Sequence, residues 1–352
     1  MSDSHNSTEH PIVQGLVRQS RWINVSDLDW YINQSGLTMG NRVKSVVAPF
    51  DQITRPKSKS MFYFWKESLP RYPQEFWSEI LAYQLAPFFG VRVSVNWPAT
   101  LKVRGEPPRV GSLAPFLINI EESESLMHGG DLLSRVKPQF RRKKGEDHSL
   151  QLCMFVLTSL DFFDHKGYPH DFFRQLVFDA LVGNSDRHQD NWGFGFVRDE
   201  NQTNVRRLLP AFDNGTSLGR ELQESKLEEL VSDRTALDRY IERGKAHIRW
   251  EEGGMLVAQR GDGIESHLWE NGPLERVNHE GLLRRTLNLF PDLRLIFDSV
   301  ISFDESLVVG SVARVAKMSR DQDHSQDIVI SSAREEFIVR SILRRRERLR
   351  MI

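Results

Sequence analysis

The first part of the chain is dominated by short apolar runs of the kind that form β-strands. The runs WINV, RVKSVVA, MFYFW, VRVSVNW, TLKV and LAPFLI all fall between Val13 and about Leu117. One segment, QEFWSEILAYQLA, has helical spacing instead, because Trp77, Ile80 and Leu81 recur three or four residues apart. The pattern predicts a small α+β unit with several strands and one helix.

Beyond about Asn119 the apolar residues follow a helical period to the end of the chain. The segments DFFRQLVFDALV and SAREEFIVRSILRRRERLR each place their apolar residues on one helical face. Between them lies a strand-like pair, WGFGFV and VRRLLPAF, joined by the polar turn RDENQTN. We interpret the charge run RRKK at residues 141–144 as a solvated loop rather than a nucleic-acid contact.

The two patterns together predict an α+β protein with a two-lobe architecture. We expect a disordered tail at residues 1–11, a β-rich N-lobe at 12–117 and a mainly helical C-lobe at 118–352, with a hinge near residues 113–119. A chain of 352 residues is long enough for two lobes, because larger cores tend to split into domains.

Composition narrows the range of partners and locations. The formal net charge of −1 predicts no bulk attraction to nucleic acid or to an anionic membrane, although local patches remain open. The N-terminus lacks the features of a signal peptide, and no run approaches the ~18 apolar residues of a membrane span. We therefore expect a cytoplasmic protein that does not enter a membrane.

The densest polar cluster is GNSDRHQDNWGFGF, residues 183–196, which follows a predicted helix and leads into the strand pair. The second strand of that pair ends at PAFDNG, so Asp213 should lie beside the cluster. Magnesium prefers oxygen ligands and keeps several waters, so Asn191 and Asp213 would suffice as protein ligands beside phosphate oxygens. Asp186 would accept or orient the proton of an attacking hydroxyl, and His188 would steady the loop or screen charge close to the phosphate.

The N-lobe offers positive charge for phosphates. In MFYFWKES, alternation places Lys66 on a strand face that is otherwise apolar, where a lysine is costly unless it has a partner. Glu75 and Glu79 on the following helix are both possible partners. Upstream, SGLTMGNRVKS places two glycines before Lys44 and a strand, which suits a backbone cradle for phosphate; the glycines are Gly36 and Gly40.

The polar cluster resembles the catalytic loop of the HipA-like kinases, a branch of the protein-kinase-like fold. Their pattern Asp-x-His-x-x-Asn is matched by Asp186, His188 and Asn191, and their metal-binding aspartate matches Asp213. Phosphoinositide kinases share DRH and the trailing asparagine, so this loop alone does not separate the two groups.

The resemblance extends into the N-lobe. A lysine followed by Glu-x-x-x-x-Gln-Leu-Ala on a helix is matched by Lys66 and EILAYQLA, which selects Glu79 as its partner. The family's Gly-x-x-x-Lys pattern is met by Gly40 and Lys44 in GNRVK, without the glutamine that usually stands in its middle. Only about 35 residues precede this point, whereas large family members have a further subdomain there.

The resemblance implies ATP- and Mg²⁺-dependent phosphorylation of a protein Ser or Thr hydroxyl, commonly by a toxin restrained by a DNA-binding antitoxin. The short N-terminus leaves the pairing with an antitoxin open, and autophosphorylation at Ser35, Thr38 or Ser45 is a further possibility by analogy. One alternative is a lipid or small-molecule kinase, although residues 221–240 hold six acids against three bases, which disfavours an anionic lipid. Another is a pseudokinase or nucleotide-binding regulatory module. Taken alone, the polar cluster would also fit a solvated loop. A transition-metal site is disfavoured, because His188 has no second histidine nearby at ligand spacing.

Overall fold

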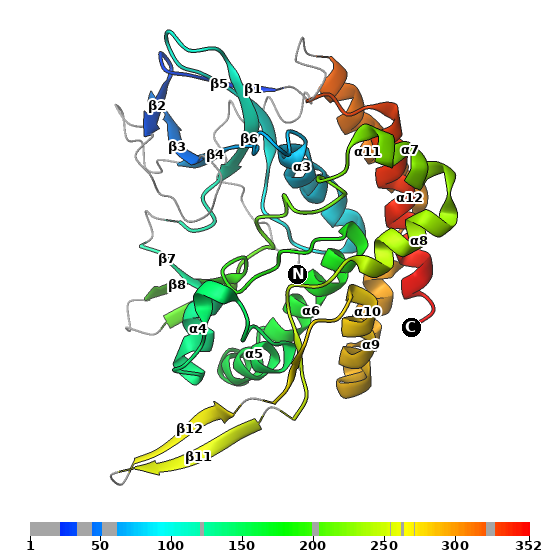
Figure 1. The fold of residues 1–352 in the computed structure, drawn as a ribbon. Coiled ribbons are helices and arrows are strands. Elements are labelled where there is room, and N and C mark those ends of the chain that lie inside the picture. The colour runs from blue at the N-terminus through cyan, green and yellow to red at the C-terminus, as the bar shows by residue number, and fades with distance from the viewer. Residues whose placement is uncertain are drawn as a thin grey trace.

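The computed structural model describes residues 22–33, 44–50, 62–119, 123–198, 204–253, 255–261, 264–270, 272–321 and 328–352. The predicted tail at 1–11 and the two candidate glycines, Gly36 and Gly40, lie outside these residues. Figure 1 shows a β-rich N-terminal part above a mainly helical C-terminal part. The predicted mixed α+β architecture is therefore confirmed.

The N-terminal part is built on a six-stranded sheet in the order β1-β5-β6-β4-β3-β2. β1 and β5 are parallel, and the other neighbouring strands are antiparallel. The strands are β1 (Ile23–Ser26), β2 (Trp30–Asn33), β3 (Lys44–Pro49), β4 (Tyr63–Glu67), β5 (Trp97–Lys102) and β6 (Arg109–Pro115).

Two details of this sheet differ from the sequence prediction. VRVSVNW forms no strand before Trp97, and Val93 makes only an isolated bridge to Ala211 of the C-terminal part. The strand β2 was not predicted, because its four residues follow a turn too closely to show a period.

Strand β4 alternates as its sequence requires. Tyr63 and Trp65 are fully buried in the core of the sheet, while Phe64 and Lys66 lie on the opposite face. Phe64 stacks on Phe116 with ring centroids 4.1 Å apart, where the chain leaves β6 for the C-terminal part. The lysine thus shares its face with aromatic rings, as predicted from alternation.

Helix α3 (Glu75–Leu85) belongs to the core of the C-terminal part although it precedes β5. Its apolar side chains pack with those of the later helices, whereas the sheet has a separate core. The indole N–H of Trp77 also donates to the carbonyl of Ile328 at 2.6 Å, and the Ser78 hydroxyl donates to the carbonyl of Ser217 at 2.9 Å. These contacts fix α3 relative to the helices that follow.

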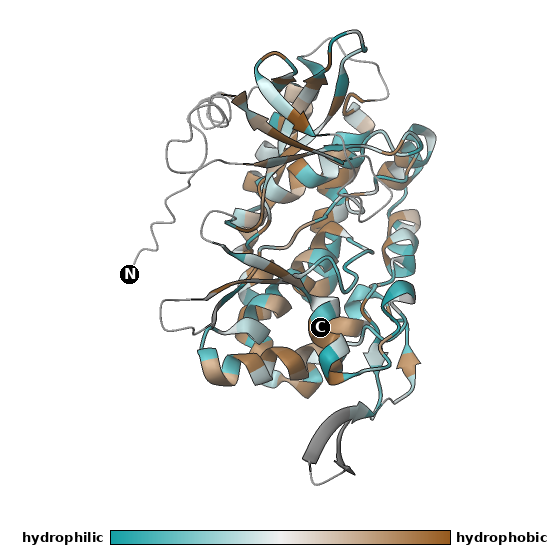
Figure 2. Ribbon diagram, turned by 90° about the vertical axis from the view of Figure 1, so that its left-hand side faces the viewer, coloured by the Kyte–Doolittle hydropathy of each residue, from teal (hydrophilic) through white to brown (hydrophobic). Residues whose placement is uncertain are grey.

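Helix α6 lies at the centre of the C-terminal part and packs against helices on several sides. Helices here carry both hydrophobic and hydrophilic residues, as expected for elements with one face in a core (Figure 2). The helices are α4 (Gly129–Val136), α5 (Leu150–Asp164), α6 (Tyr168–Val182), α7 (Glu224–Ser232), α8 (Arg234–Arg243), α9 (His279–Leu289), α10 (Arg294–Ile301), α11 (Glu305–Arg320) and α12 (Ser332–Leu349), with short 3₁₀ turns η1 (Ala86–Phe89), η2 (Arg142–Lys144) and η3 (Pro291–Leu293).

Strands also occur in the C-terminal part. The predicted pair forms β8 (Gly193–Arg198) and β9 (Asn204–Leu208), joined at one edge by β7 (Ser125–His128). The expectation of helix throughout the rest was wrong for residues 250–275. There β10 (Trp250–Glu251) pairs with β13 (Leu274–Glu275), and β11 (Met255–Gly261) pairs with β12 (Ile264–Glu270) in a hairpin that projects from the body (Figure 1).

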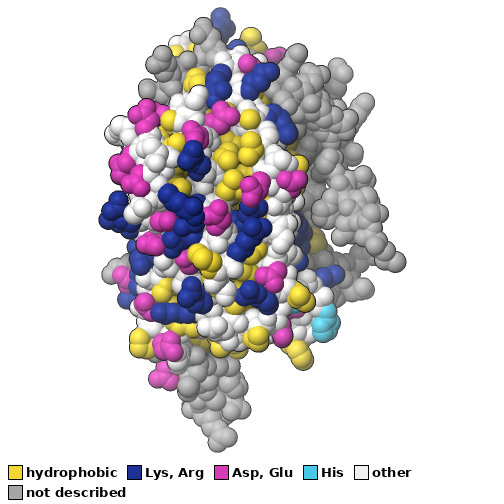
Figure 3. Space-filling view, turned by 90° about the vertical axis from the view of Figure 1, so that its right-hand side faces the viewer, with side chains coloured by type: hydrophobic (Ala, Val, Ile, Leu, Met, Phe, Trp, Pro, Cys, Tyr) yellow, Lys and Arg dark blue, Asp and Glu magenta, His cyan; other side chains and the backbone are white. Residues whose placement is uncertain are grey.

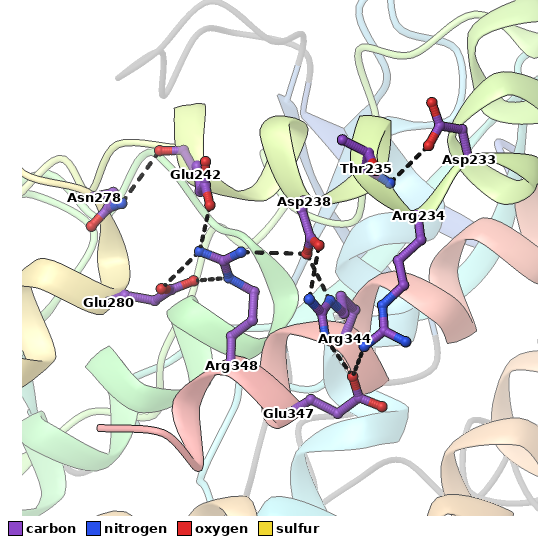
Figure 4. A network of polar contacts seen from close by, with 10 residues as sticks. All are labelled: Asp233, Arg234, Thr235, Asp238, Glu242, Asn278, Glu280, Arg344, Glu347 and Arg348. Carbon is purple, nitrogen blue, oxygen red and sulfur yellow. Dashed lines mark hydrogen bonds and ion pairs between the residues drawn. The ribbon is translucent and has the colours of Figure 1, made fainter.

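The last helix is held by ion pairs to α8 and α9. Arg344 donates to both carboxylate oxygens of Asp238 at 2.6 and 2.8 Å, and Arg348 bonds Glu242 and Glu280 (Figure 4). The face seen in Figure 3 carries charges of both signs close together. Among the described residues, no helix is both long enough and apolar enough to span a membrane.

Removing the anchor of α3 should destabilise the protein. We expect Trp77→Ala to lower the free energy of unfolding by about 3–5 kcal/mol, because it leaves a cavity at a buried aromatic position. Trp77→Phe keeps a ring but loses the bond to Ile328, so it should cost less, about 1–2 kcal/mol. Urea unfolding followed by tryptophan fluorescence measures both; equal stability of all three proteins would contradict the anchoring role.

Candidate active site

The polar loop begins where α6 ends. Gly183 stops the helix with a φ of +69°, a conformation that glycine adopts without steric cost. Asn184 then accepts hydrogen bonds at its side-chain oxygen from the backbone N–H of Asp186 at 3.1 Å and from the Thr216 hydroxyl at 2.7 Å. The loop is thereby joined to the segment that follows Asp213.

Arg187 is the centre of this loop, with 2% of its surface exposed. Its guanidinium makes two bonds to the buried carboxylate of Asp179 at 3.0 and 2.8 Å. It also donates to the carbonyls of Asn191 at 2.9 Å and Phe212 at 2.6 Å, and to the side-chain oxygen of Asn214 at 2.6 Å. One side chain therefore connects α6, the loop and the segment around Asp213, which follows β9 because that strand ends at Leu208 and not at Phe212 as predicted.

Sequence reasoning assigned no role to Arg187. Arginine is rarely buried, so nothing in its local sequence distinguishes it from a solvated residue. Burial raises the pKa of the Asp179 carboxyl, and the guanidinium of Arg187 acts in the opposite direction. A buried carboxylate of this kind needs its partner, since a lone buried charge is strongly unfavourable.

Lys66 extends from strand β4 toward Asp213. Its ammonium lies 3.5 Å from Glu79 Oε1 and 3.7 Å from Asp213 Oδ1. The other Glu79 oxygen accepts from the backbone N–H of Asn214 at 3.0 Å. Glu79 is fully buried. Helix α3, strand β4 and the segment that contains Asp213 therefore meet at its carboxylate.

Asp213 and Asn191 present oxygen atoms suited to a hard cation. Asp213 has a φ of +57°, an uncommon conformation for a residue other than glycine and one that clusters at functional sites. The Asn191 amide donates its N–H to the carbonyl of Asp186 at 2.8 Å, and no donor among the described residues bonds its side-chain oxygen. One carboxylate and one amide oxygen fit Mg²⁺, which takes its remaining ligands from water and phosphate. Within the same residues, no group of three or more His, Cys, Asp or Glu could hold a metal.

His188 is tied into the loop by its ring. Its Nδ1 accepts a hydrogen bond from the backbone N–H of Asp190 at 3.1 Å. Burial lowers the pKa of His188, against the opposite effect of Asp186 and Asp190. A neutral ring in this position can steady the loop, which is one of the two roles that the sequence suggested.

The remaining N-lobe candidates fall in different places. Lys44 lies directly opposite Lys66 in the register of β3 and β4. Glu75, the other possible partner of Lys66, instead bonds Arg220 at 2.8 Å. Ser45 has only 2% of its surface exposed, so its hydroxyl is not accessible for phosphorylation in this conformation, and Ser35 and Thr38 lie outside the described residues.

The interpretation of RRKK as a solvated loop was wrong for Arg142. Its guanidinium bonds Asp190 of the polar loop at 2.9 Å and Asp131 of α4 at 2.5 Å, and these acids raise its pKa. Its carbonyl also accepts from the Gln189 side chain at 2.8 Å. Gln189 and Asp190 are 47 and 48 residues away from Arg142 in the sequence, so a local charge pattern could not reveal these bonds.

Comparison with known proteins gives one local sequence match. No family model matches the chain. Over 91 residues it is 30% identical to the serine/threonine-protein kinase CtkA of Helicobacter pylori. That match covers 26% of this chain and 27% of the relative, so it spans about a quarter of the length of the curated relative.

The structural similarity covers far more of the chain than the sequence similarity does. The crystal structure of a Helicobacter pylori proinflammatory kinase, CtkA, superimposes with a TM-score of 0.64 at 17% identity. The superposition covers 93% of this chain and 94% of that one. This protein therefore has the kinase fold of CtkA, with a β-rich N-terminal sheet and a helical C-terminal part, as the two-lobe prediction expected.

Buried histidines near the loop should make stability depend on pH. His148 accepts a hydrogen bond from the Trp192 indole at 3.1 Å, and burial holds its pKa well below the ordinary value of 6.5. The folded protein thus keeps this ring neutral while the unfolded chain takes up a proton, so stability is lost as pH falls below 6.5. His148→Gln, which retains an acceptor for Trp192, should make the decline between pH 6.5 and 5 shallower by up to about 1.4 kcal/mol per pH unit. Urea unfolding at several pH values measures this slope; an unchanged slope would contradict the assignment.

Proposed function

We propose that this protein is an ATP-dependent serine/threonine protein kinase of the HipA-like type. The observation that supports it most is that Lys66, Glu79 and Asp213 meet in one ion-paired cluster beside the loop that contains Asp186 and Asn191. The fold of CtkA and the partial sequence match to it add independent support. Because that match is local, the activity remains our proposal for the chain as a whole.

Each polar group has a place in phosphoryl transfer. Lys66 and Lys44 lie opposite each other in the register of β3 and β4, so both ammonium groups would contribute positive charge for the ATP phosphates. Asn191 and Asp213 would hold Mg²⁺, which supplies charge neutralisation at the phosphate oxygens. Glu79 orients Lys66 and also fixes the backbone beside Asp213.

Asp186 is placed to act on the acceptor. Its backbone is bonded on both sides, through its N–H to Asn184 and through its carbonyl to Asn191, while no donor among the described residues bonds its carboxylate. The carboxylate would take the proton of the acceptor hydroxyl. As it does so, the hydroxyl oxygen would bond the γ-phosphorus, the bond from that phosphorus to ADP would break, and ADP would leave. Asp186 is thus the catalytic base of the proposal, with His188 steadying the loop.

The acceptor is proposed to be a protein, as the description of CtkA as a serine/threonine kinase suggests. The acids of residues 221–240 no longer bear on a lipid alternative, since several are bonded elsewhere: Asp238 to the arginines of α12, Glu229 to Lys226 and Glu221 to Tyr240. An inactive nucleotide-binding module is less favoured, because every polar role has a suitably placed side chain. A cytoplasmic location and an antitoxin partner stay predictions.

Replacing either carboxylate should stop transfer without unfolding the protein. We expect Asp186→Asn and Asp213→Asn to lower the rate of phosphate transfer at least ~100-fold, the typical contribution of a positioned proton acceptor and a lower bound for a metal ligand. Label incorporated from γ-labelled ATP into host lysate proteins measures the rate, and circular dichroism checks the fold. Asp321→Asn, an exposed acid at the end of α11, is the matched control and should retain full activity. Full activity in either site variant would contradict the roles.

The choice between protein and lipid acceptors can be tested with the wild-type chain. We expect ATP-dependent labelling of lysate proteins and no labelling of phosphoinositide vesicles, with both reactions stopped by a chelator of Mg²⁺. Label in lipid but not in protein would select the lipid kinase. ATP binding without transfer to either acceptor would select the regulatory module.

A further inference from the structure

The segment of residues 245–250, which bends at His247 and Ile248, runs beside the catalytic loop. Its backbone bridges two neighbours: the N–H of Ala246 donates to the carbonyl of Val277 at 3.1 Å, and the N–H of Arg249 donates to the carbonyl of His148 at 2.9 Å. Burial alternates along it, with Ala246 and Ile248 in the core. Lys245, His247 and Arg249, which alternate with these two, are less buried and form the opposite side of the segment.

That opposite side faces the catalytic loop. The ring of His247 lies 5.8 Å from the ring of His188 and 6.0 Å from that of His148, measured between centroids. A Cβ at Gly145 would come within 2.7 Å of the same ring, so the histidine is packed between the loop and the turn after η2. His188 is two residues from Asp186, so the segment borders the proposed acceptor position.

Lys245 and Arg249 flank His247 in the chain, and Arg276 lies beside it on the neighbouring segment; we call these three cations the basic strip. Arg276 immediately precedes Val277, which pairs with the residue before His247. Burial lowers the pKa of His247 to about 4; Asp186 acts against this, while His188, Arg276 and Arg249 add to it. The antiparallel bridge between Lys245 and Asn278 places Arg276 beside His247, whose ring packs against that of His188 in the loop that contains Asp186.

The basic strip has no counter-charge within the part of the chain that the structure describes: no carboxylate there pairs with any of the three side chains. Apart from Asp186, the nearby acids are engaged elsewhere: Glu275 with Arg285, Glu252 with the Trp250 indole, Asp190 with Arg142 and Glu251 with Trp269. Arg249 is also half-buried, so its charge is only partly solvated. Lys245 and Arg276 are exposed beside it. A half-buried cation without an acidic partner, next to two exposed cations, favours binding of an anionic group.

We propose that the basic strip is an acceptor-recognition surface, which selects Ser or Thr hydroxyls flanked by acidic side chains on a protein. This rests on the proposed kinase function, because the strip is defined by its position beside Asp186. Guanidinium groups bind carboxylates through paired hydrogen bonds, and several such contacts near the reacting hydroxyl would hold it in position. An overall charge of −1 conceals this local excess of positive charge.

The test compares two matched peptides that differ only in charge. One has a central serine flanked by Glu and Asp, and the other has Gln and Asn at the same positions. With the full chain and Mg-ATP, we expect kcat/KM about tenfold or more higher for the acidic peptide, from several partly exposed ion contacts. Raising the salt from about 0.05 to 0.5 M should reduce this preference, because exposed charges are screened.

Charge-removing variants locate the preference. Arg249→Gln combined with Arg276→Gln should abolish the preference for the acidic peptide while leaving the KM for ATP and the rate on the neutral peptide unchanged. Arg314→Gln, an exposed arginine of α11, is the matched control and should keep the preference. Equal kcat/KM for the two peptides, or a preference that survives in the double variant, would overturn the proposal while leaving kinase activity established.

A direct binding measurement distinguishes loss of peptide recognition by the basic strip from loss of phosphate transfer. Fluorescence anisotropy of the labelled acidic peptide needs no turnover, so it decides the proposal even if neither peptide is phosphorylated. We expect binding to the wild type about tenfold tighter than to the double variant. Equal binding would overturn the proposal, and so would tight binding of phosphoinositide vesicles at the strip with no gain for the acidic peptide.

Discussion

The buried pair of Arg187 and Asp179 is the interaction on which the site depends. The pair joins the central helix α6 to the catalytic loop, and the same guanidinium bonds the carbonyls of Asn191 and Phe212. Buried ion pairs do not by themselves stabilise a fold, because desolvation offsets the attraction. Here the pair fixes relative positions, so that Asn191 and the residue after Phe212, the metal-binding candidate Asp213, can act on one cation.

Helix α3 applies a second constraint to the same region. Glu79, Ser78 and Glu75 bond Asn214, Ser217 and Arg220, at points three residues apart in the segment that follows Asp213. Helix α3 is packed in the core of the C-terminal part. Lys66 of strand β4 therefore meets a helix that the C-terminal part holds in place. The geometry of the site therefore depends on two supports, while the sheet carries Lys66 and Glu79 of α3 orients its ammonium group.

Much of this arrangement could be predicted from sequence, for a physical reason. Asp186, Asn191 and Asp213 lie close along a loop and one hairpin, so local pattern places them together, and alternation places Lys66 on the correct face of β4. Arg187, Arg142 and the basic strip could not be found this way. Their roles arise from partners far away in sequence, and from burial or neighbouring charge that no local window records.

The central claim is that residues from both parts of the chain converge on one Mg-nucleotide site. Anomalous diffraction from crystals grown with Mn²⁺ and a non-hydrolysable ATP analogue tests it most directly. The account predicts one manganese peak between the side-chain oxygens of Asn191 and Asp213, with the terminal phosphate between Lys66 and Asp186. A nucleotide and metal bound away from these four residues would contradict it.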